Sequence, residues 1–284
     1  MQSRTIGNTD VSAIGLGAMP MSLEDRPERA QSIRTIHAAL DAGVRLIDTA
    51  DSYCISTDET GHNERLIAEA LAQWSGDADD VLVATKGGHY RPGDGSWAQD
   101  GSPEHLKQAC EASLKALGID TIALYQFHRP DSNVPYAESV GALKELQDEG
   151  KVRMIGISNA SIAQIDQARG IVDVVSVQNQ FSPSFRSSHD ELRHCAEHGI
   201  RFLPYSPLGG MGDAKNLGTE HSAFAAVADE HGVSPHQVAL AWELAQAPVV
   251  IPIPGASRPE TITDSLKAAG LKLSEDQLER LNQA

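Results

Sequence analysis

The amino-acid sequence predicts a closed (β/α)8 barrel of the TIM type, and three observations support this fold class. Eight short apolar segments recur along the 284 residues. Amphipathic stretches with helical periodicity lie between them, so strand and helix alternate along the chain. The last seven segments are too uniformly apolar for strands with one face in water, which indicates parallel strands covered on both sides. The number of units and the chain length together favour a closed barrel over an open, doubly wound sheet.

The predicted strands, in chain order, are residues 13–17, 45–49, 81–85, 122–127, 153–158, 174–178, 200–204 and 249–253. Helical segments between them include RAQSIRTIHAALDAG, NERLIAEALAQW and PYAESVGALKELQDEG, two of which end in glycine, a favoured residue after a helix. Ahead of the first strand, residues 3–13 predict a β-hairpin that turns through Gly7, Asn8, Thr9 and Asp10 and closes the barrel floor.

We expect a single domain over residues 1–284, made of the hairpin (3–13), the barrel (14–270) and a C-terminal tail (271–284). The tail, LSEDQLERLNQA after the last unit, is long enough for one short helix.

Charge and composition exclude several classes of protein. The 23 Lys and Arg against 39 Asp and Glu give a formal net charge of −16, and no Lys/Arg-rich run is present, so we expect no binding to nucleic acid. No apolar stretch reaches the length of a signal peptide or a membrane span, which predicts a cytoplasmic protein that does not bind membranes. The three cysteines are far apart and fit reduced thiols. A monomer and a small homo-oligomer both remain open.

Four polar residues stand at or just after the carboxyl ends of neighbouring predicted strands, where a barrel of this type has its active site. Asp48 and Lys86 end the second and third strands, Tyr53 follows in the loop after the second, and His128 ends the fourth. Each alone has an ordinary explanation as a cap, a solvated side chain or a structural imidazole. Together on one face they predict a catalytic site.

The motifs around these residues resemble those of the aldo-keto reductases. They are LIDTADSY with NERLIAEAL, VLVATKGG, LYQFHRPD, GKVRMIGISN, VQNQFSP, PYSPLGG and IPIPGASRP, and the resemblance runs from residue 3 to residue 270. It implies a barrel that binds a nicotinamide cofactor without a separate dinucleotide-binding domain. Consistent with this, GLGAMP at 15–20 lacks the third glycine and the helix of a G-x-G-x-x-G fingerprint.

The resemblance implies that Asp48, Tyr53, Lys86 and His128 form a catalytic tetrad for reduction of an aldehyde or ketone. Hydride transfer to a carbonyl carbon leaves charge on the oxygen, which needs a proton donor and groups that hydrogen-bond to that oxygen. Tyr53 would donate the proton, and the ammonium of Lys86, kept charged by Asp48, would lower the pKa of the phenol. His128 would orient the substrate oxygen.

The resemblance also implies a set of cofactor contacts. Ser158, Asn159 and Gln178 would bind the nicotinamide carboxamide, and Tyr205 would stack on the ring. The pyrophosphate would be lined by Ser206, Pro207, Leu208 and Gly210, and the remaining contacts would come from Gly255, Ser257, Arg258 and Asp264. Ser and Asn after a strand are also ordinary turn residues, so these positions depend on the tetrad for their interpretation.

The segment after the eighth strand favours NADPH over NADH. Ser257 or Arg258 can cap a helix that begins with Pro259, a favoured first residue. Free amides at a helix N-terminus beside a guanidinium and a hydroxyl form an anion site, which suits the 2′-phosphate of NADP. Asp264, one turn further along, is available to contact the adenine.

The substrate is expected to be a small carbonyl compound. Side chains that could line its site, or pack beneath loops, are His89, Tyr90, Trp97, Met19, Met21, Phe181 and Phe185, and Cys54 directly follows the tyrosine. His194 and His198 have helical spacing, but the order of residues does not match a zincin motif, so we expect no metal site. The alternative function is a nicotinamide-binding sensor or accessory subunit with negligible turnover.

Overall fold

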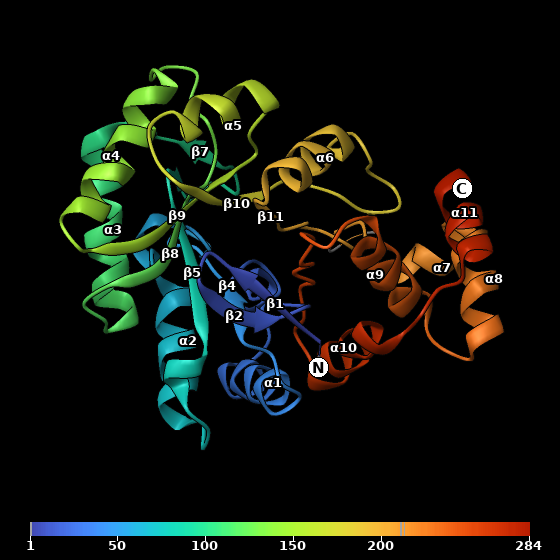
Figure 1. The fold of residues 1–284 in the computed structure, drawn as a ribbon. Coiled ribbons are helices and arrows are strands. Elements are labelled where there is room, and N and C mark those ends of the chain that lie inside the picture. Colours follow the sequence, from blue (N-terminus) through green and yellow to red (C-terminus); the bar gives the residue numbers. More distant parts are fainter. Residues whose placement is uncertain (1, 211, 213) are drawn as a thin grey trace.

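The computed structural model describes residues 2–210, 212 and 214–284. Its centre is a parallel sheet with strand order β11-β10-β9-β8-β5-β4-β3, which curls into a barrel with helices on the outside (Figure 1). These strands are β3 (Leu16–Gly17), β4 (Leu46–Asp48), β5 (Leu82–Gly87), β8 (Ile122–Phe127), β9 (Val152–Ser158), β10 (Val174–Gln178) and β11 (Arg201–Phe202). Each lies within or overlaps one of the first seven predicted strands. The prediction of a (β/α)8 fold is confirmed.

The eighth predicted strand, residues 249–253, closes the barrel without forming a regular strand. Val250 forms a parallel bridge to Phe202 on one side, and Gly255 forms one to Gly17 on the other. The carbonyl oxygens of Pro252 and Pro254 accept hydrogen bonds from the amides of Gly15 and Gly17, in the first predicted barrel strand, each at 2.9 Å. Because proline has no N–H, the segment cannot form a continuous ladder. The predicted position was therefore correct, and the predicted regular strand was wrong.

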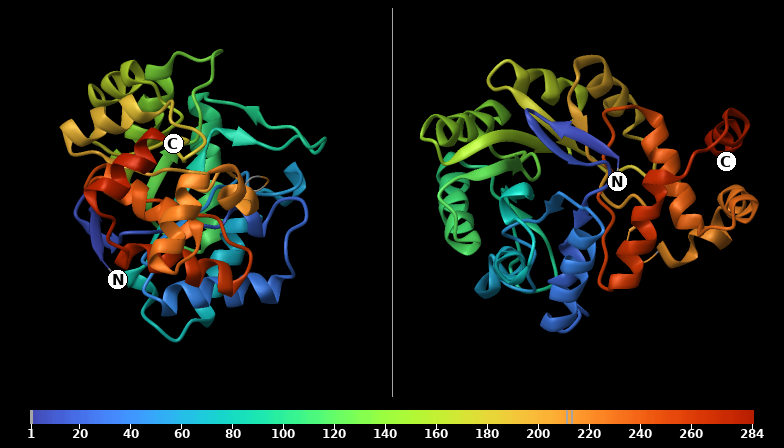
Figure 2. Two further views of the ribbon diagram at one scale, coloured as in Figure 1. Left: turned by 90° about the vertical axis from the view of Figure 1, so that its right-hand side faces the viewer. Right: turned by 60° about the horizontal axis from the view of Figure 1, so that its bottom comes forward.

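An antiparallel hairpin of β1 (Ser3–Ile6) and β2 (Thr9–Ser12) closes the floor of the barrel, as the sequence predicted. Its Ile6 and Val11 are buried in a cluster with side chains from the barrel interior, namely Leu46, Leu82, Ala84, Leu124, Met154, Leu203, Ile251 and Ile253. Figure 2 shows the hairpin lying across the end of the barrel. The lower half of the barrel is thus a packed apolar core, which leaves the opposite end for polar side chains.

The helices of the described chain are α1 (Arg29–Asp41), α2 (His62–Gln73), α3 (Pro103–Leu117), α4 (Tyr136–Asp148), α5 (Ile162–Arg169), α6 (His189–His198), α7 (Leu217–Glu220), α8 (Ser222–His231), α9 (Pro235–Gln246), α10 (Pro259–Leu266) and α11 (Glu275–Gln283). Most of them cover the outer face of the sheet, while α7 and α8 pack on α9, and α11 packs on α8 (Figure 1). Ser161 and Ser274 begin α5 and α11 with capping boxes, which satisfy amides of the first turn. Within the described part of the chain, every helix is too short or too polar to cross a bilayer.

A second antiparallel hairpin follows β5 and is formed by β6 (His89–Tyr90) and β7 (Ala98–Gln99). In the left view of Figure 2 it lies at the end of the barrel opposite to the β1–β2 hairpin. Only Gly88 separates the end of β5 from the start of β6. The β6–β7 hairpin therefore belongs to the same end as the carboxyl termini of the strands.

Candidate active site

The period of the strands places two of the predicted catalytic residues, Asp48 and Lys86, inside the barrel. Side chains two residues apart on a strand point to the same face. In β4, Leu46 belongs to the apolar interior cluster, so Asp48 faces inward one layer higher, and in β5 Ala84 and Lys86 stand in the same relation. The side chains of Lys86 and Asp48 are 0% and 4% exposed. The upper layer of the barrel thus holds a buried ion pair.

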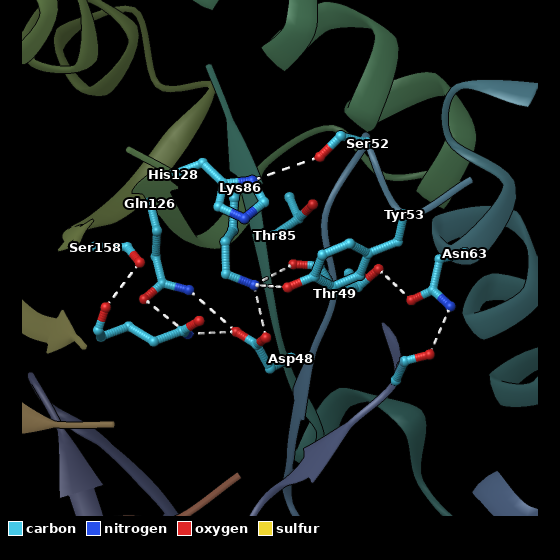
Figure 3. Close-up of polar contacts among 12 residues, drawn as sticks. Asp48, Thr49, Ser52, Tyr53, Asn63, Thr85, Lys86, Gln126, His128 and Ser158 are labelled. Carbon is cyan, nitrogen blue, oxygen red and sulfur yellow. Dashed lines mark hydrogen bonds and ion pairs between the residues drawn. The ribbon is translucent and has the colours of Figure 1, made fainter. Parts of the chain in front are cut away.

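All three N–H donors of the Lys86 ammonium have acceptors. Nζ donates to Asp48 Oδ1 at 2.6 Å, to the carbonyl of Thr49 at 2.8 Å and to the phenolic oxygen of Tyr53 at 3.0 Å (Figure 3). A buried ammonium is tolerated when its charge is paired and its donors are satisfied. Burial acts to lower the pKa of Lys86, but Asp48 and Tyr53 raise it by more, so the lysine stays charged.

The phenol of Tyr53 remains protonated in this environment. Burial raises the pKa of Tyr53 above its usual value, and the nearby charge of Lys86 offsets only part of that rise. The sequence led us to expect that Lys86 would bring the pKa of Tyr53 down. The direction of the lysine's effect was correct, but the expected net shift was wrong, because burial is the larger contribution.

His128 completes the group of four. Its ring centroid lies 5.8 Å from that of Tyr53, with the two planes at 80°, and its Nδ1 lies 3.5 Å from Ser52 Oγ. Burial holds the pKa of His128 well below its usual value, and the charge of Lys86 lowers it further. The imidazole is therefore neutral near pH 7, with one N–H to donate. The structure brings all four predicted tetrad residues together.

The second oxygen of Asp48 is held by two glutamines. Gln178 Nε2 donates to Oδ2 at 2.7 Å and Gln126 Nε2 donates at 3.2 Å. Gln126 was not identified from the sequence, although it is the one strongly polar residue in the apolar strand IALYQF and therefore carried a signal. The amide nitrogen of Gln178 bonds the carboxylate, and the cofactor contact expected for Gln178 stays a prediction.

A pair of buried carboxyl groups lies behind the tetrad. Asp51 and Glu64 are both almost fully buried, and burial raises the pKa of each. Glu64 accepts a hydrogen bond from Thr85 at 2.5 Å, while Oδ1 of Asp51 and Oε2 of Glu64 have no partner among the described residues. The motifs LIDTADSY and NERLIAEAL contain both residues, but no pattern in these motifs indicates that the two side chains lie together.

Four of the predicted cofactor residues form a linked polar group beside the tetrad. Tyr205 OH donates to Asn159 Oδ1 at 2.8 Å, and Asn159 Nδ2 donates to Ser158 Oγ at 3.0 Å. Asn159 also donates to the backbone carbonyl of His128 at 3.0 Å, which connects this group to the tetrad. Ser158 Oγ in turn donates to the carbonyl of Gln178 at 2.7 Å. These contacts bring Ser158, Asn159, Gln178 and Tyr205 together, and their binding of a cofactor stays a prediction.

The backbone at these positions is unusual. Asn159 and Ser206 have φ of +56° and +52°, and Asp25 is the only other non-glycine residue with positive φ in the described chain. The left-handed region costs a non-glycine residue free energy and occurs preferentially at functional sites. In the following turn Gly209 and Gly210 take the same sign of φ without such a cost, and Pro207 and Leu208 lie between.

The segment after the barrel has the capping geometry that the sequence predicted. Arg258 is the extended N-cap residue of α10, its side chain makes no capping hydrogen bond, and Pro259 is the first helical residue. The carbonyl of Ser257 accepts from Gln31 at 2.9 Å. At Gly255 a Cβ atom would lie 2.9 Å from Pro20, so only glycine fits there without a shift.

Asp264 has partners within the protein. Its two carboxylate oxygens accept from Ser234 Oγ and from Gln237 Nε2, each at 2.6 Å. Both donors lie at the start of α9, so Asp264 joins α10 to α9. The adenine contact expected for Asp264 stays a prediction.

The side chains named as candidate substrate contacts fall into two groups. Met21 is buried in the core, and Phe181 stacks on Trp242 with centroids 5.4 Å apart, so both pack beneath loops. Trp97 is 40% exposed, and its ring centroid lies 6.5 Å from that of Tyr53, at the site. Cys54 is buried, and burial raises the pKa of its thiol to about 11, which leaves it unreactive.

The histidines that suggested a metal motif lie on the outer helix α6. His194 Nε2 lies 2.9 Å from Asp166 Oδ1, and His198 Nδ1 lies 2.9 Å from the backbone carbonyl of His194. Together with Glu197 they bring three potential ligand atoms within 4.8 Å of one another. All are on the surface, on the side of the barrel away from the polar centre. The expectation that they bind no metal stays a prediction.

Comparisons with known proteins all point to one family. A model of the Aldo/keto reductase family matches residues 13–284. "Probable aldo-keto reductase 1" of Glycine max is 35% identical over 303 residues, which cover 97% of this chain and 86% of that protein. "Pyridoxine 4-dehydrogenase" of Escherichia coli is 33% identical over 288 residues, which cover 98% and 96%. The crystal structure of an aldo/keto reductase from Klebsiella pneumoniae in complex with NADP and acetate matches with TM-score 0.83 at 28% identity, covering 99% of this chain and 93% of that one.

Proposed function

This chain belongs to the aldo/keto reductase family and is an oxidoreductase of that family, and we propose that it reduces a small aldehyde or ketone to an alcohol with NADPH. The observation that carries the proposal is the buried chain of contacts from Asp48 through Lys86 to Tyr53, with His128 beside it. This arrangement places a protonated phenol and a neutral imidazole next to each other at the carboxyl end of the barrel. A carbonyl oxygen that gains charge needs both.

The proposed roles follow from the contacts. The chemistry that the bound cofactor supplies is transfer of a hydride to the carbonyl carbon. Tyr53 donates its proton to the carbonyl oxygen as negative charge develops there. Lys86 stabilises the phenolate that remains, since Nζ already lies 3.0 Å from the phenolic oxygen. His128 donates an N–H to the same carbonyl oxygen and sets its direction. Asp48 holds Lys86 in place.

The residues around the tetrad fit a nicotinamide. Ser158, Asn159 and the amide oxygen of Gln178 offer donors and acceptors suited to a carboxamide. The hydroxyl of Tyr205 is fixed by Asn159, which holds the aromatic ring in one orientation beside that group, as a stacking partner requires. The solved Klebsiella relative in complex with NADP supports the assignment of the cofactor.

The N-terminus of α10 fits the 2′-phosphate of NADPH. The side chain of the N-cap residue Arg258 makes no capping hydrogen bond, and Ser257 directly precedes it in the chain, so a guanidinium, a hydroxyl and free amides are available at this helix start. On a chain with formal net charge −16, a local cation is needed to hold a phosphate group. This charge argument supports a preference for NADPH over NADH.

One experiment tests the proposed function directly. Purified protein is loaded with one equivalent of NADPH and mixed with 4-nitrobenzaldehyde or pyridoxal, and the absorbance of the reduced nicotinamide is followed through a single turnover. Pyridoxal is included because one relative is named a pyridoxine dehydrogenase. Loss of the absorbance supports a reductase. A rise in melting temperature with NADPH but no oxidation by any aldehyde or ketone tested would identify a nucleotide sensor and contradict the proposal.

A further inference from the structure

His89 occupies a position beside the tetrad that the proposed mechanism does not use. β5 ends at Gly87, Gly88 turns the chain with φ of +104°, and His89 begins β6. The two residues of β6 face opposite ways, with His89 6% exposed and Tyr90 37% exposed. Asp100 N–H bonds the carbonyl of Gly88 at 3.1 Å and holds the base of the hairpin together. His89 therefore faces inward at the end of the barrel that carries the active site.

The surroundings of His89 are those of a substrate site. Its ring centroid lies 4.4 Å from that of His128 and 5.6 Å from that of Trp97. Trp97 meets the ring of Tyr53 edge to face, and the guanidinium of Arg91 lies 4.6 Å from the Trp97 centroid on the same hairpin. Two tetrad residues and His89 thus share one aromatic enclosure with Trp97.

Both ring nitrogens of His89 are buried and have no hydrogen-bond partner among the described residues. A buried polar atom without a partner has lost its hydrogen bonds to water and gained none in return, so such atoms are uncommon unless a function requires them. Burial lowers the pKa of His89 to about 4, and the charges of Arg129 and Lys86 lower it too. The ring is neutral, with one N–H donor and one acceptor nitrogen.

The hairpin does not depend on these nitrogens. Arg91 forms an ion pair with Glu24, and its backbone carbonyl accepts from Thr57 Oγ1 at 2.6 Å. At the other end of the hairpin, the N–H of Gly101 donates to Asp131 at 3.0 Å. Other side chains therefore anchor the segment at both ends. A purely apolar side chain at position 89 would serve the fold equally well.

We propose that His89 is a specificity residue that binds a hydroxyl group on the carbon next to the substrate carbonyl, so that α-hydroxy aldehydes and α-hydroxy ketones are the favoured substrates. The inference rests on the proposed function, which places the carbonyl oxygen at His128. Oxygens on adjacent carbons lie about one hydrogen-bond length apart, which matches two imidazole rings side by side with centroids at 4.4 Å. A hydroxyl both donates and accepts, as the neutral ring of His89 does.

The test uses glycolaldehyde and propanal, which differ by a hydroxyl in place of a methyl group. With saturating NADPH, kcat/KM is measured for both aldehydes in the wild type and in His89→Leu. We expect the substitution to lower kcat/KM about tenfold for glycolaldehyde, or about 1.4 kcal/mol, which is within the range of one neutral hydrogen bond. For propanal we expect a change below about threefold. Comparing variants cancels the different hydration of the two aldehydes.

Two further variants separate a hydrogen bond from packing. His89→Gln keeps an amide that can donate and accept, so it should retain part of the glycolaldehyde rate that His89→Leu loses. His105→Leu removes an imidazole from the neighbouring helix α3, which faces Tyr90 rather than His128, and should leave the ratio of the two rates unchanged. If His89→Leu does not fold, as judged by thermal melting, His89→Phe takes its place with an aromatic ring of similar shape.

The outcomes separate this inference from the proposed function. An equal loss for both aldehydes, or no loss for either, would overturn the role of His89 while leaving the reductase intact. Absence of NADPH oxidation by either aldehyde in the wild type and in every variant would instead contradict the proposed function. A selective loss for glycolaldehyde in His89→Leu, partly restored in His89→Gln, supports the inference.

Discussion

The ammonium of Lys86 lies 3.0 Å from the phenolic oxygen of Tyr53, and both side chains are buried at the upper layer of the barrel. Two groups with ordinary pKa values near 10 therefore share one proton network out of contact with bulk water. Lys86 is charged because Asp48 lies on its other side, and Tyr53 is protonated because burial disfavours the phenolate. The charged Lys86 beside a protonated Tyr53 is the basis of the prediction for Lys86 and of the final test of Tyr53.

Removing the ammonium should destabilise the fold as well as the reaction. Lys86→Met leaves Asp48 buried without its counter-ion, and breaking a buried pair in this way costs about 3–5 kcal/mol. The double variant Asp48→Asn/Lys86→Met removes both charges and should recover part of that loss. Urea unfolding of the single and double variants measures the difference. A double variant that loses the sum of the two single losses would show that the pair is not coupled.

The buried carboxyl group of Asp51 should make the folded protein less stable as pH rises. Burial, and next the neighbouring Glu64, raise the pKa of Asp51 in the folded state, so the folded protein holds this proton more tightly than the unfolded chain. The stability that this group contributes is full below its usual pKa of about 4 and is lost as pH increases towards the raised value.

Asp51→Asn removes this titration. The gain in unfolding free energy of the variant over the wild type should therefore be larger at pH 8 than at pH 5, as measured by urea midpoints at each pH. Asp58→Asn, an exposed acid in the same loop, serves as the control and should change stability little at either pH. A difference between Asp51→Asn and the wild type that is the same at both pH values would contradict the assignment.

Arg258 should distinguish the two nicotinamide cofactors. If its guanidinium binds the 2′-phosphate, Arg258→Ala raises KM for NADPH by about tenfold or more and leaves KM for NADH nearly unchanged, because a charge-assisted hydrogen bond contributes about 1.5–3 kcal/mol. Lys267→Ala removes an exposed cation just beyond the other end of α10 and should affect neither cofactor. Equal increases of KM for both cofactors in Arg258→Ala would mean that the arginine does not bind the phosphate.

The sequence was sufficient for much of the fold because burial of parallel strands leaves a clear pattern. Seven apolar segments became strands, and the position of the eighth was also correct. The exception has a local cause, since Pro252 and Pro254 interrupt the ladder that the apolar pattern of 249–253 suggested. The two prolines are visible in the sequence, and their missing N–H groups predict the interruption once the segment is assumed to pair with a neighbouring strand on each side.

The candidate site could be located from the sequence, but its energetics could not. Asp48, Lys86 and His128 follow strands, so the common end of the strands brings them together. The net pKa shift of Tyr53 depends instead on how completely the surrounding loops bury it, and no local pattern records that. Likewise, the sequence does not show that both ring nitrogens of His89 lack a hydrogen-bond partner among the described residues. That absence can be seen only when the neighbouring donors and acceptors are located in the structure.

The most direct test of the central claim is single-turnover oxidation of bound NADPH by 4-nitrobenzaldehyde in the wild type and in Tyr53→Phe. The variant keeps the ring and its packing but has no proton to donate. We expect its rate to fall by a factor of about 10² to 10⁴, the usual contribution of general acid catalysis, with NADPH affinity unchanged. A rate in Tyr53→Phe within a few-fold of the wild type would remove the phenol from the reaction and contradict the account.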